Sequence, residues 1–153
     1  MKNLTKYILA VSAILLFSAI KPVMAQKKST FQPAEGKDIQ YNALYVLNSG
    51  DEKRIEGTLR NIKNALEDPR LKGKLYIELI AFSGGVAVYD KNGPFKDALV
   101  DLKSRGVMLV QCENTLRERK ISKSSLYDFV DYVPSGNGEI ILRHYEGWAV
   151  VHP

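Results

Sequence analysis

Apolar runs alternate with amphipathic stretches along the chain, at the spacing of strands and helices. Residues 43–47 and 75–82 are apolar runs between polar residues, which is typical of strands that are buried on both faces. A helical stripe lies between them and consists of Ile55, Leu59, Ile62 and Leu66. This part of the sequence predicts a strand, a helix and a second strand.

The same alternation continues to the end of the chain. Residues 86–89 read as a short helical turn, and Phe95, Leu99 and Leu102 as a helix that Gly106 ends before a third strand at 107–110. Two short elements follow: a helix at 114–120, and a helix carrying Leu126 and Phe129 with Ser122 or Ser124 as its cap. The last predicted elements are a strand at 132–133, a helix that Gly147 ends, and a strand at 148–151. Ile140, Ile141 and His144 share one face of that helix, joined by Trp148 if the helix extends that far.

Strands that alternate with helices predict a three-layer α/β/α domain with a mainly parallel five-stranded sheet. In such sheets chemistry occurs at the carboxyl ends of strands, here after residues 47, 82 and 110. Ser49 and Glu52 have capping-box spacing for the first helix. Glu78 interrupts the second apolar run, which indicates either a position at the end or edge of the sheet or a paired carboxylate.

The first 25 residues have the pattern of a cleavable signal peptide. Lys2 and Lys6 precede an apolar run, and a small-residue site ends at Ala25. The alternative is an uncleaved anchor, but the run is shorter than the roughly 20 apolar residues that span a bilayer. We therefore expect a periplasmic or secreted protein without membrane attachment after cleavage, with a flexible arm at 26–40 and one domain at 41–153.

Composition excludes several functions. The chain has 22 Lys+Arg, of which Lys2, Lys6 and Lys21 lie in the leader, so 19 remain against 17 Asp+Glu. This near-neutral balance gives no support for nucleic-acid binding. One Cys and two His provide no disulfide framework and little material for a metal site, and no nucleotide-binding glycine motif is present. We expect no metal and no cofactor.

The single cysteine, Cys112, lies where a strand ends and a helix begins. Free N–H groups at a helix N-terminus stabilise a thiolate, which is a nucleophile or a sulfur acceptor. The alternative is a buried hydrophobic residue, because free cysteines are among the most buried residues. Arg117, Arg119 and Lys120 would add positive field if they point back toward the sulfur.

Other polar residues near strand ends have two readings each. Gly84 and Gly85 either form a backbone nest for a small anion or permit close packing. Asn114 is a candidate cap for the helix after Cys112, and Thr115 a candidate donor to a bound anion. His144 is predicted to be packed or at a subunit interface rather than to act as a base for Cys112. Helix capping is the simplest role of Asn48, Ser49 and Asp51.

The segment VMLVQCENTLRER at 107–119 resembles the DsrE/DsrF family, whose exported members have a strand followed by Cys and Asn-Thr-Leu-Arg. LNSGD at 47–51 and IAFSGGV at 80–86 resemble the family's first two strand–loop segments. VPSG at 133–136 and YEGWA at 145–149 resemble its C-terminal part. The resemblance covers about residues 41–153.

This resemblance implies a three-layer α/β/α domain that forms homo- or hetero-oligomers, and a persulfide-carrying cysteine at Cys112. Relay members act in the cytoplasm with partner chains, whereas this chain has an export signal, and His144 stands where exported members often have Gln. The leading hypothesis is a sulfur carrier rather than a turnover enzyme, served by a donor or acceptor protein. Its candidate ligand-binding residues are Gly84, Gly85, Asn114, Thr115 and Arg117. The alternatives are a binding module with a structural Cys112 and a thiol redox sensor.

Overall fold

The structure, a computed structural model, describes residues 30–153, so the predicted signal peptide lies outside the described residues. Residues 35–153 form one compact unit. Its strands are β1 (Tyr41–Leu47), β2 (Leu75–Ala81), β3 (Met108–Cys112), β4 (Asp131–Val133) and β5 (Ala149–Val151). Its helices are α2 (Glu52–Glu67), α3 (Lys96–Ser104), α4 (Glu113–Arg119) and α5 (Gly136–Tyr145), with 3₁₀ turns η1 (Ser83–Tyr89) and η2 (Lys123–Ser125).

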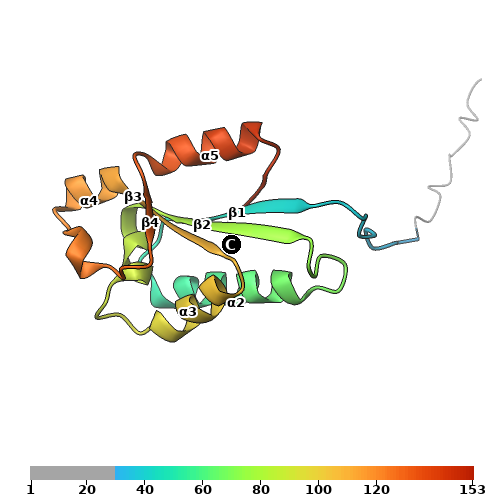
Figure 1. Cartoon of the computed structure of the whole chain (residues 1–153), viewed down its shortest axis with the longest axis horizontal. Helices are drawn as coiled ribbons and strands as arrows, with labels where there is room; N and C mark the ends of the chain where they lie inside the picture. The colour runs from blue at the N-terminus through green and yellow to red at the C-terminus, as the bar shows by residue number, and fades with distance from the viewer. Residues whose placement is uncertain (1–29) are drawn as a thin grey trace, which may run out of the picture. The chain divides into compact units, whose positions relative to one another are not determined.

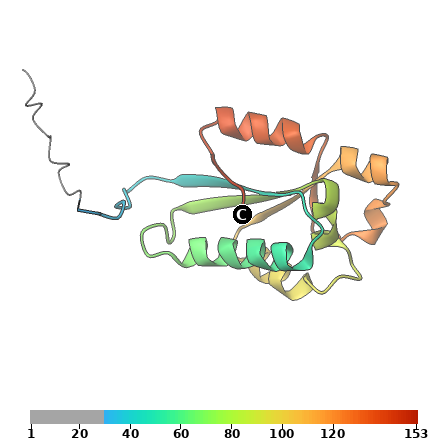
Figure 2. The same cartoon turned by 180° about the vertical axis from the view of Figure 1, so that it is seen from behind.

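The five strands form one sheet in the order β4-β3-β2-β1-β5, and every neighbouring pair is parallel. Helices α2 and α3 lie on one face of the sheet and α5 lies on the other (Figure 1), as the view from behind also shows (Figure 2). The predicted three-layer α/β/α architecture is therefore confirmed. Each helix between residues 30 and 153 is too short or too polar to span a bilayer.

The strands are apolar on both faces because both faces are covered. Leu47, Leu79 and Leu109 point into a large core that also contains the buried stripes of α2 and α3. Leu44, Val46, Ile80 and Val110 point the other way and form a smaller core, against which Ile140 and Trp148 pack. The face beneath α5 is thus the less extensively packed side of the sheet.

Three local expectations were wrong. The capping-box reading of Ser49 was wrong, whereas the capping role predicted for Asp51 is confirmed: its carboxylate accepts a hydrogen bond from the Arg54 N–H at 2.9 Å. Helix α5 ends at Tyr145 and the chain turns at Gly147, as predicted, but the shared face of Ile141 and Trp148 is not formed: Trp148 follows the helix, and Ile141 is 56% exposed. The turn η2 is capped by Ser122 but stops before Leu126 and Phe129, a shorter helix than predicted.

Glu78 lies on β2, the middle strand of the sheet, and is completely buried. The edge reading of this residue is therefore wrong, and the paired-carboxylate reading is confirmed: the Arg143 side chain of α5 donates to Glu78 Oε2 at 2.8 Å. An acidic residue stands in the core strand because a basic residue from the covering helix reaches it.

Candidate active site around Cys112

Cys112 is the last residue of β3 and occupies the N-cap position of α4, as the sequence predicted. It lies on the same face of β3 as Val110, which is the face covered by α5. The residue is 5% exposed. A position at the carboxyl edge of a parallel sheet is where this fold class places its chemistry.

A second helix N-terminus lies beside Cys112. Strand β4 runs parallel to β3 with Val133 opposite Cys112, so the residues after β4 pass next to those after β3. The Asn114 N–H donates to the Pro134 carbonyl at 3.2 Å, and α5 then begins at Gly136, with Ser135 as its cap. The sequence patterns did not predict that residues 134–136 contribute to the surroundings of Cys112. The signal was Ser135, an N-cap residue shortly before the apolar residues of α5.

A small pocket of about 140 Å³ opens at this point. The residues that line it are Phe82, Ser83, Cys112, Asn114, Thr115, Glu118, Ser135, Gly136 and Asn137. They come from the ends of β2 and β3, from α4 and from the first turn of α5. Cys112 is thus largely buried, as expected of a cysteine that packs as a hydrophobic residue, but it also faces a cavity, as expected of a reactive thiol.

The site favours the ionised form of the thiol. Burial raises the pKa of Cys112, but the backbone N–H groups of Thr115 and Gly136 and the Thr115 hydroxyl outweigh this effect, so the pKa lies below its ordinary value. The donors belong to α4 and α5, whose N-terminal ends carry partial positive charge. A thiolate held in this way can act as a nucleophile or a sulfur acceptor.

Thr115 connects the Cys112 environment to the loop after β2. Its hydroxyl oxygen accepts a hydrogen bond from the Ser83 N–H at 2.9 Å, which leaves the hydroxyl hydrogen to face the sulfur. Ser83 has a positive φ of 50°, a conformation that is unusual for a residue other than glycine. Thr115 is buried, so the structure places it as a donor to the cysteine within a fixed network.

The two glycines after β2 pack against the end of β1. A Cβ on Gly84 would lie 2.7 Å from the Gly50 nitrogen, and one on Gly85 would lie 2.1 Å from the Leu47 carbonyl oxygen. Neither glycine lines the Cys112 pocket. The close-packing reading of these glycines accounts for both positions.

The polar residues of α4 divide between the pocket and its rim. Asn114 lines the pocket but does not cap α4, because Cys112 holds that position; instead the Asn114 side chain accepts a hydrogen bond from Arg117. Arg117 does not line the pocket, whereas Arg119 reaches Ser83 Oγ at 3.4 Å and Glu118 forms part of the wall. The rim therefore carries charge of both signs.

His144 is exposed in the single chain, so it is not packed within the domain, while its predicted position at a subunit interface stays a prediction. It lies near the C-terminal end of α5, eight positions along the helix from Gly136, which corresponds to about 12 Å of helix axis. The residue is therefore remote from Cys112, in agreement with the prediction that it is not a base for the thiol. Within residues 30–153 no cluster of three or more His, Cys, Asp or Glu could hold a metal ion.

Comparison with known proteins places this fold. No protein-family model matches the chain, and no curated protein matches it. Among solved structures, the protein of unknown function MTH1491 from Methanobacterium thermoautotrophicum is 32% identical, with a TM-score of 0.70, over 74% of this chain and all of that chain. The YchN protein from E. coli is 18% identical, with a TM-score of 0.54, over 74% of this chain and all of that chain.

The sheet, its helices and these neighbours define a protein of the DsrE-like α/β fold. More particularly, the chain belongs to the same family as MTH1491, whose whole length it matches. YchN, at its lower identity, shares the fold.

Proposed function

We propose that this protein is an exported member of the DsrE/DsrF-like proteins and that it carries sulfane sulfur as a persulfide on Cys112. The observation that carries the proposal is the position of the thiol, which faces a small pocket between the N-termini of α4 and α5, where backbone N–H groups lower its pKa. The signal-peptide pattern at residues 1–25 supports an extracytoplasmic setting.

The proposed step is a thiolate attack on a persulfide donor, R–S–SH. The Cys112 thiolate attacks the outer sulfur, the new S–S bond forms on Cys112, and the donor S–S bond breaks with its electron pair leaving as R–S⁻. No external oxidant or reductant is needed. A thiol of an acceptor protein then takes the outer sulfur by the same exchange, which regenerates Cys112.

The size of the pocket fits this chemistry. Pockets for drug-sized ligands measure about 300–1,000 Å³, whereas the Cys112 pocket is about 140 Å³. It has room for an added sulfur atom and a few water molecules. A drug-sized ligand does not fit beside Cys112, whereas a small ligand would. The burial of the thiol argues against the redox-sensor alternative, because an interchain disulfide needs Cα atoms within about 7 Å of each other.

The residues proposed to act here are Cys112 as sulfur acceptor, with Thr115, Asn114 and Gly136 around it. Gly84, Gly85 and Arg117 were expected to contact a ligand, but they lie outside the pocket lining, and the proposal does not use them. Glu118 in the wall opposes donors with several negative charges, which favours a persulfide carried by a thiol over thiosulfate.

The test is incubation of the chain beginning at Gln26 with a small-molecule persulfide, with polysulfide and with thiosulfate, followed by intact-mass and peptide mass spectrometry. We expect the mass of one sulfur atom to be added at Cys112, more readily from persulfide than from thiosulfate, and no such addition to the Cys112→Ser variant. Absence of the adduct with every donor, while Cys112 still reacts with an alkylating agent, would rule the carrier function out.

A further inference from the structure

Helix α5 contacts the sheet at two places along its length. Its first residue, Gly136, lies beside Cys112 and Phe82, where a Cβ would approach the Phe82 side chain to 3.1 Å. Seven residues later, Arg143 reaches Glu78 on β2. Seven helical residues span about 10 Å, and the four strand residues from Glu78 to Phe82 span about 13 Å, so the helix bridges these two points of one sheet face.

A carboxylate such as that of Glu78 is unusual at the second contact between α5 and the sheet. Its side chain is 0% exposed on the middle strand, and its Oε1 atom has no hydrogen-bond partner in the structure. Burying a carboxylate with one unpartnered oxygen is unfavourable, and an apolar residue at such a place often gives an equally stable or more stable protein. Stability alone therefore does not explain this residue.

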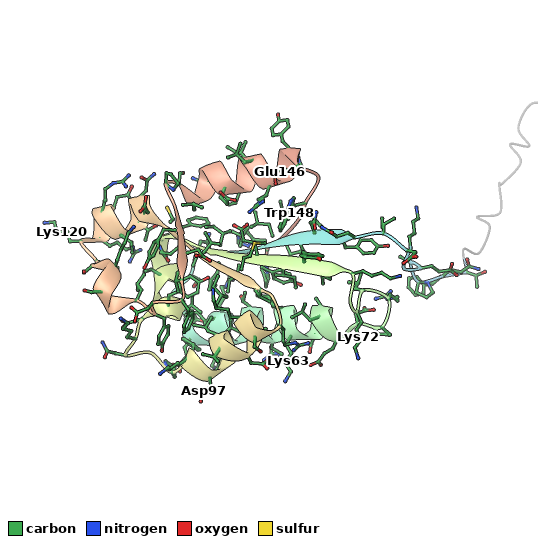
Figure 3. All side chains as sticks on the ribbon, viewed as in Figure 1. Lys63, Lys72, Asp97, Lys120, Glu146 and Trp148 are labelled. Atoms are coloured by element: carbon green, nitrogen blue, oxygen red, sulfur yellow. The ribbon has the colours of Figure 1, made fainter. Side chains whose placement is uncertain are left out.

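Arg143 is held in a fixed orientation. Its Nε lies 2.8 Å from Glu78 and 2.9 Å from Glu139, and its Nη1 lies 3.0 Å from Glu146. The guanidinium group also stacks over the Trp148 ring, 4.4 Å from its centroid. Figure 3 shows Trp148 between the end of α5 and the sheet, with Glu146 at the end of the helix. A planar group with this many partners fixes direction as well as distance.

Apolar packing supplies little of the contact between α5 and the sheet. Gly136 is the only buried residue of the helix, and Ile140 is partly buried against the smaller core. Ile141, Leu142 and Tyr145 point outward and are more than half exposed. The polar contact of Arg143 with Glu78 is therefore a main determinant of where α5 lies on the sheet.

We infer that Glu78 and Arg143 are positioning residues for Cys112: they fix α5 on the sheet so that the Gly136 N–H faces the sulfur. This inference rests on the proposed function only for its biological purpose, since it concerns the thiol itself. Neither residue touches the pocket, and both act through the placement of α5. The carboxylate in the core is then explained by orientation of a helix rather than by stability.

The test measures the reaction of Cys112 with iodoacetamide as a function of pH in the full chain without its leader. Arg143→Met and Glu78→Leu remove the contact, and Arg143→Lys retains part of it. Arg105→Met is the control, because Arg105 is 27% exposed against 26% for Arg143 and pairs with two carboxylates where Arg143 pairs with three. Arg105 lies at the end of α3, on the other face of the sheet.

In both variants that lack the contact, we expect the apparent pKa of the thiol to move up toward its ordinary value. The shift should reduce the thiolate fraction at fixed pH below the pKa by about three-fold, which corresponds to half a pKa unit. Arg143→Lys should lie between these variants and the wild type, and Arg105→Met should match the wild type. If Arg143→Met does not fold, Glu78→Leu still tests the inference, because its apolar side chain suits the buried position.

Superimposable pH profiles of wild type and Glu78→Leu would overturn the inference. The two proposals fail separately. A shifted profile without any sulfur adduct on the wild type leaves the positioning role intact and rejects the carrier function. A sulfur adduct on the wild type together with unshifted pH profiles supports the carrier function and rejects the positioning role of Glu78 and Arg143.

Discussion

Gly136 lies at the Cys112 thiol, although the two residues belong to different strand–helix units of the chain. Their proximity follows from the parallel register that sets Val133 opposite Cys112, because both strands end at the same edge and each is followed by a helix. One cysteine thereby faces the N-terminal ends of two helices.

The Cys112 thiol should titrate below the pKa that it has in the unfolded chain, because N–H and O–H donors outweigh the effect of burial. A folded pKa below the unfolded one stabilises the protein above the unfolded pKa, and this contribution is lost as pH falls through the folded pKa. Relative to Cys112→Ser, the wild type should therefore gain stability as pH rises through that window. Urea unfolding of both proteins across the alkaline range measures this. If the free energy of unfolding of the wild type falls relative to that of Cys112→Ser as pH rises, the prediction is contradicted.

Replacing Gly136 by Ala should move the start of α5 away from the sheet, since the added Cβ would lie 3.1 Å from Phe82 side-chain atoms. We expect a loss of about 1–3 kcal/mol in the free energy of unfolding, typical of overpacking, together with a higher Cys112 pKa. Gly57→Ala in α2 is the control: its Cβ would meet only the Arg60 side chain at 3.7 Å, so it should stabilise the helix by about 0.5–1 kcal/mol. Equal effects of the two substitutions on Cys112 alkylation would show that the start of α5 at Gly136 does not lower the pKa of Cys112.

Ionisation of Glu78 should cost stability. Burial raises its pKa, and the neighbouring Arg143 opposes this only in part. A carboxyl group with a raised folded pKa contributes stability that is fully present below its unfolded pKa and is lost as pH rises through the folded one. The Glu78→Gln variant has no carboxyl group to ionise at this position, so its stability does not fall for this reason as pH rises. At pH 7 it should be as stable as the wild type or up to about 1 kcal/mol more stable.

Urea unfolding of the Glu78→Gln variant at pH 4 and pH 7 measures the difference. The stability of the variant relative to the wild type should increase between these two values. A relative stability that falls instead would mean that the ionised pair with Arg143 is net stabilising.

The family resemblance implies that the protein forms oligomers. We expect the outer side of α5 to mediate this self-association. Ile141, Leu142 and Tyr145 are 56%, 62% and 86% exposed and adjoin one another on the helix surface. Contiguous exposed apolar side chains of this kind mark interaction surfaces. Light scattering should give an oligomer for the wild type and a smaller species for Leu142→Glu, while Val100→Glu, at a 47% exposed position on α3, should leave the mass unchanged. A monomeric wild type would exclude this role.

Local sequence patterns were sufficient to predict the parallel sheet and the place of Cys112. Strands β1 to β3 consist mainly of apolar residues and are followed by polar segments, so the carboxyl end of β3, where Cys112 lies, could be identified directly. The capping of α2 was misplaced because Ser49 and Asp51 are both good N-cap residues, and only the path of the chain decides between them.

The partners of Cys112 could not be predicted in the same way. Gly136 approaches the thiol through strand pairing between β3 and β4, a contact that no local pattern contains. The same holds for Glu78, whose partner Arg143 is 65 positions away. The sequence showed that this carboxylate was out of place in an apolar run, but the sheet order and the docking of α5 were needed to show why.

The hydrogen bond from Ser83 to Thr115 has a consequence for how Cys112 loses its proton. Because the Thr115 oxygen accepts from Ser83, the hydroxyl group presents its hydrogen to the sulfur, and a group in this orientation is no proton acceptor. Neither Ser83 nor Thr115 then serves as the base, so the proton of the thiol passes to solvent or to the Glu118 carboxylate in the pocket wall. The rate at which Cys112 exchanges its proton is thereby set by the opening of this small cavity and by its wall, separately from how acidic the thiol is.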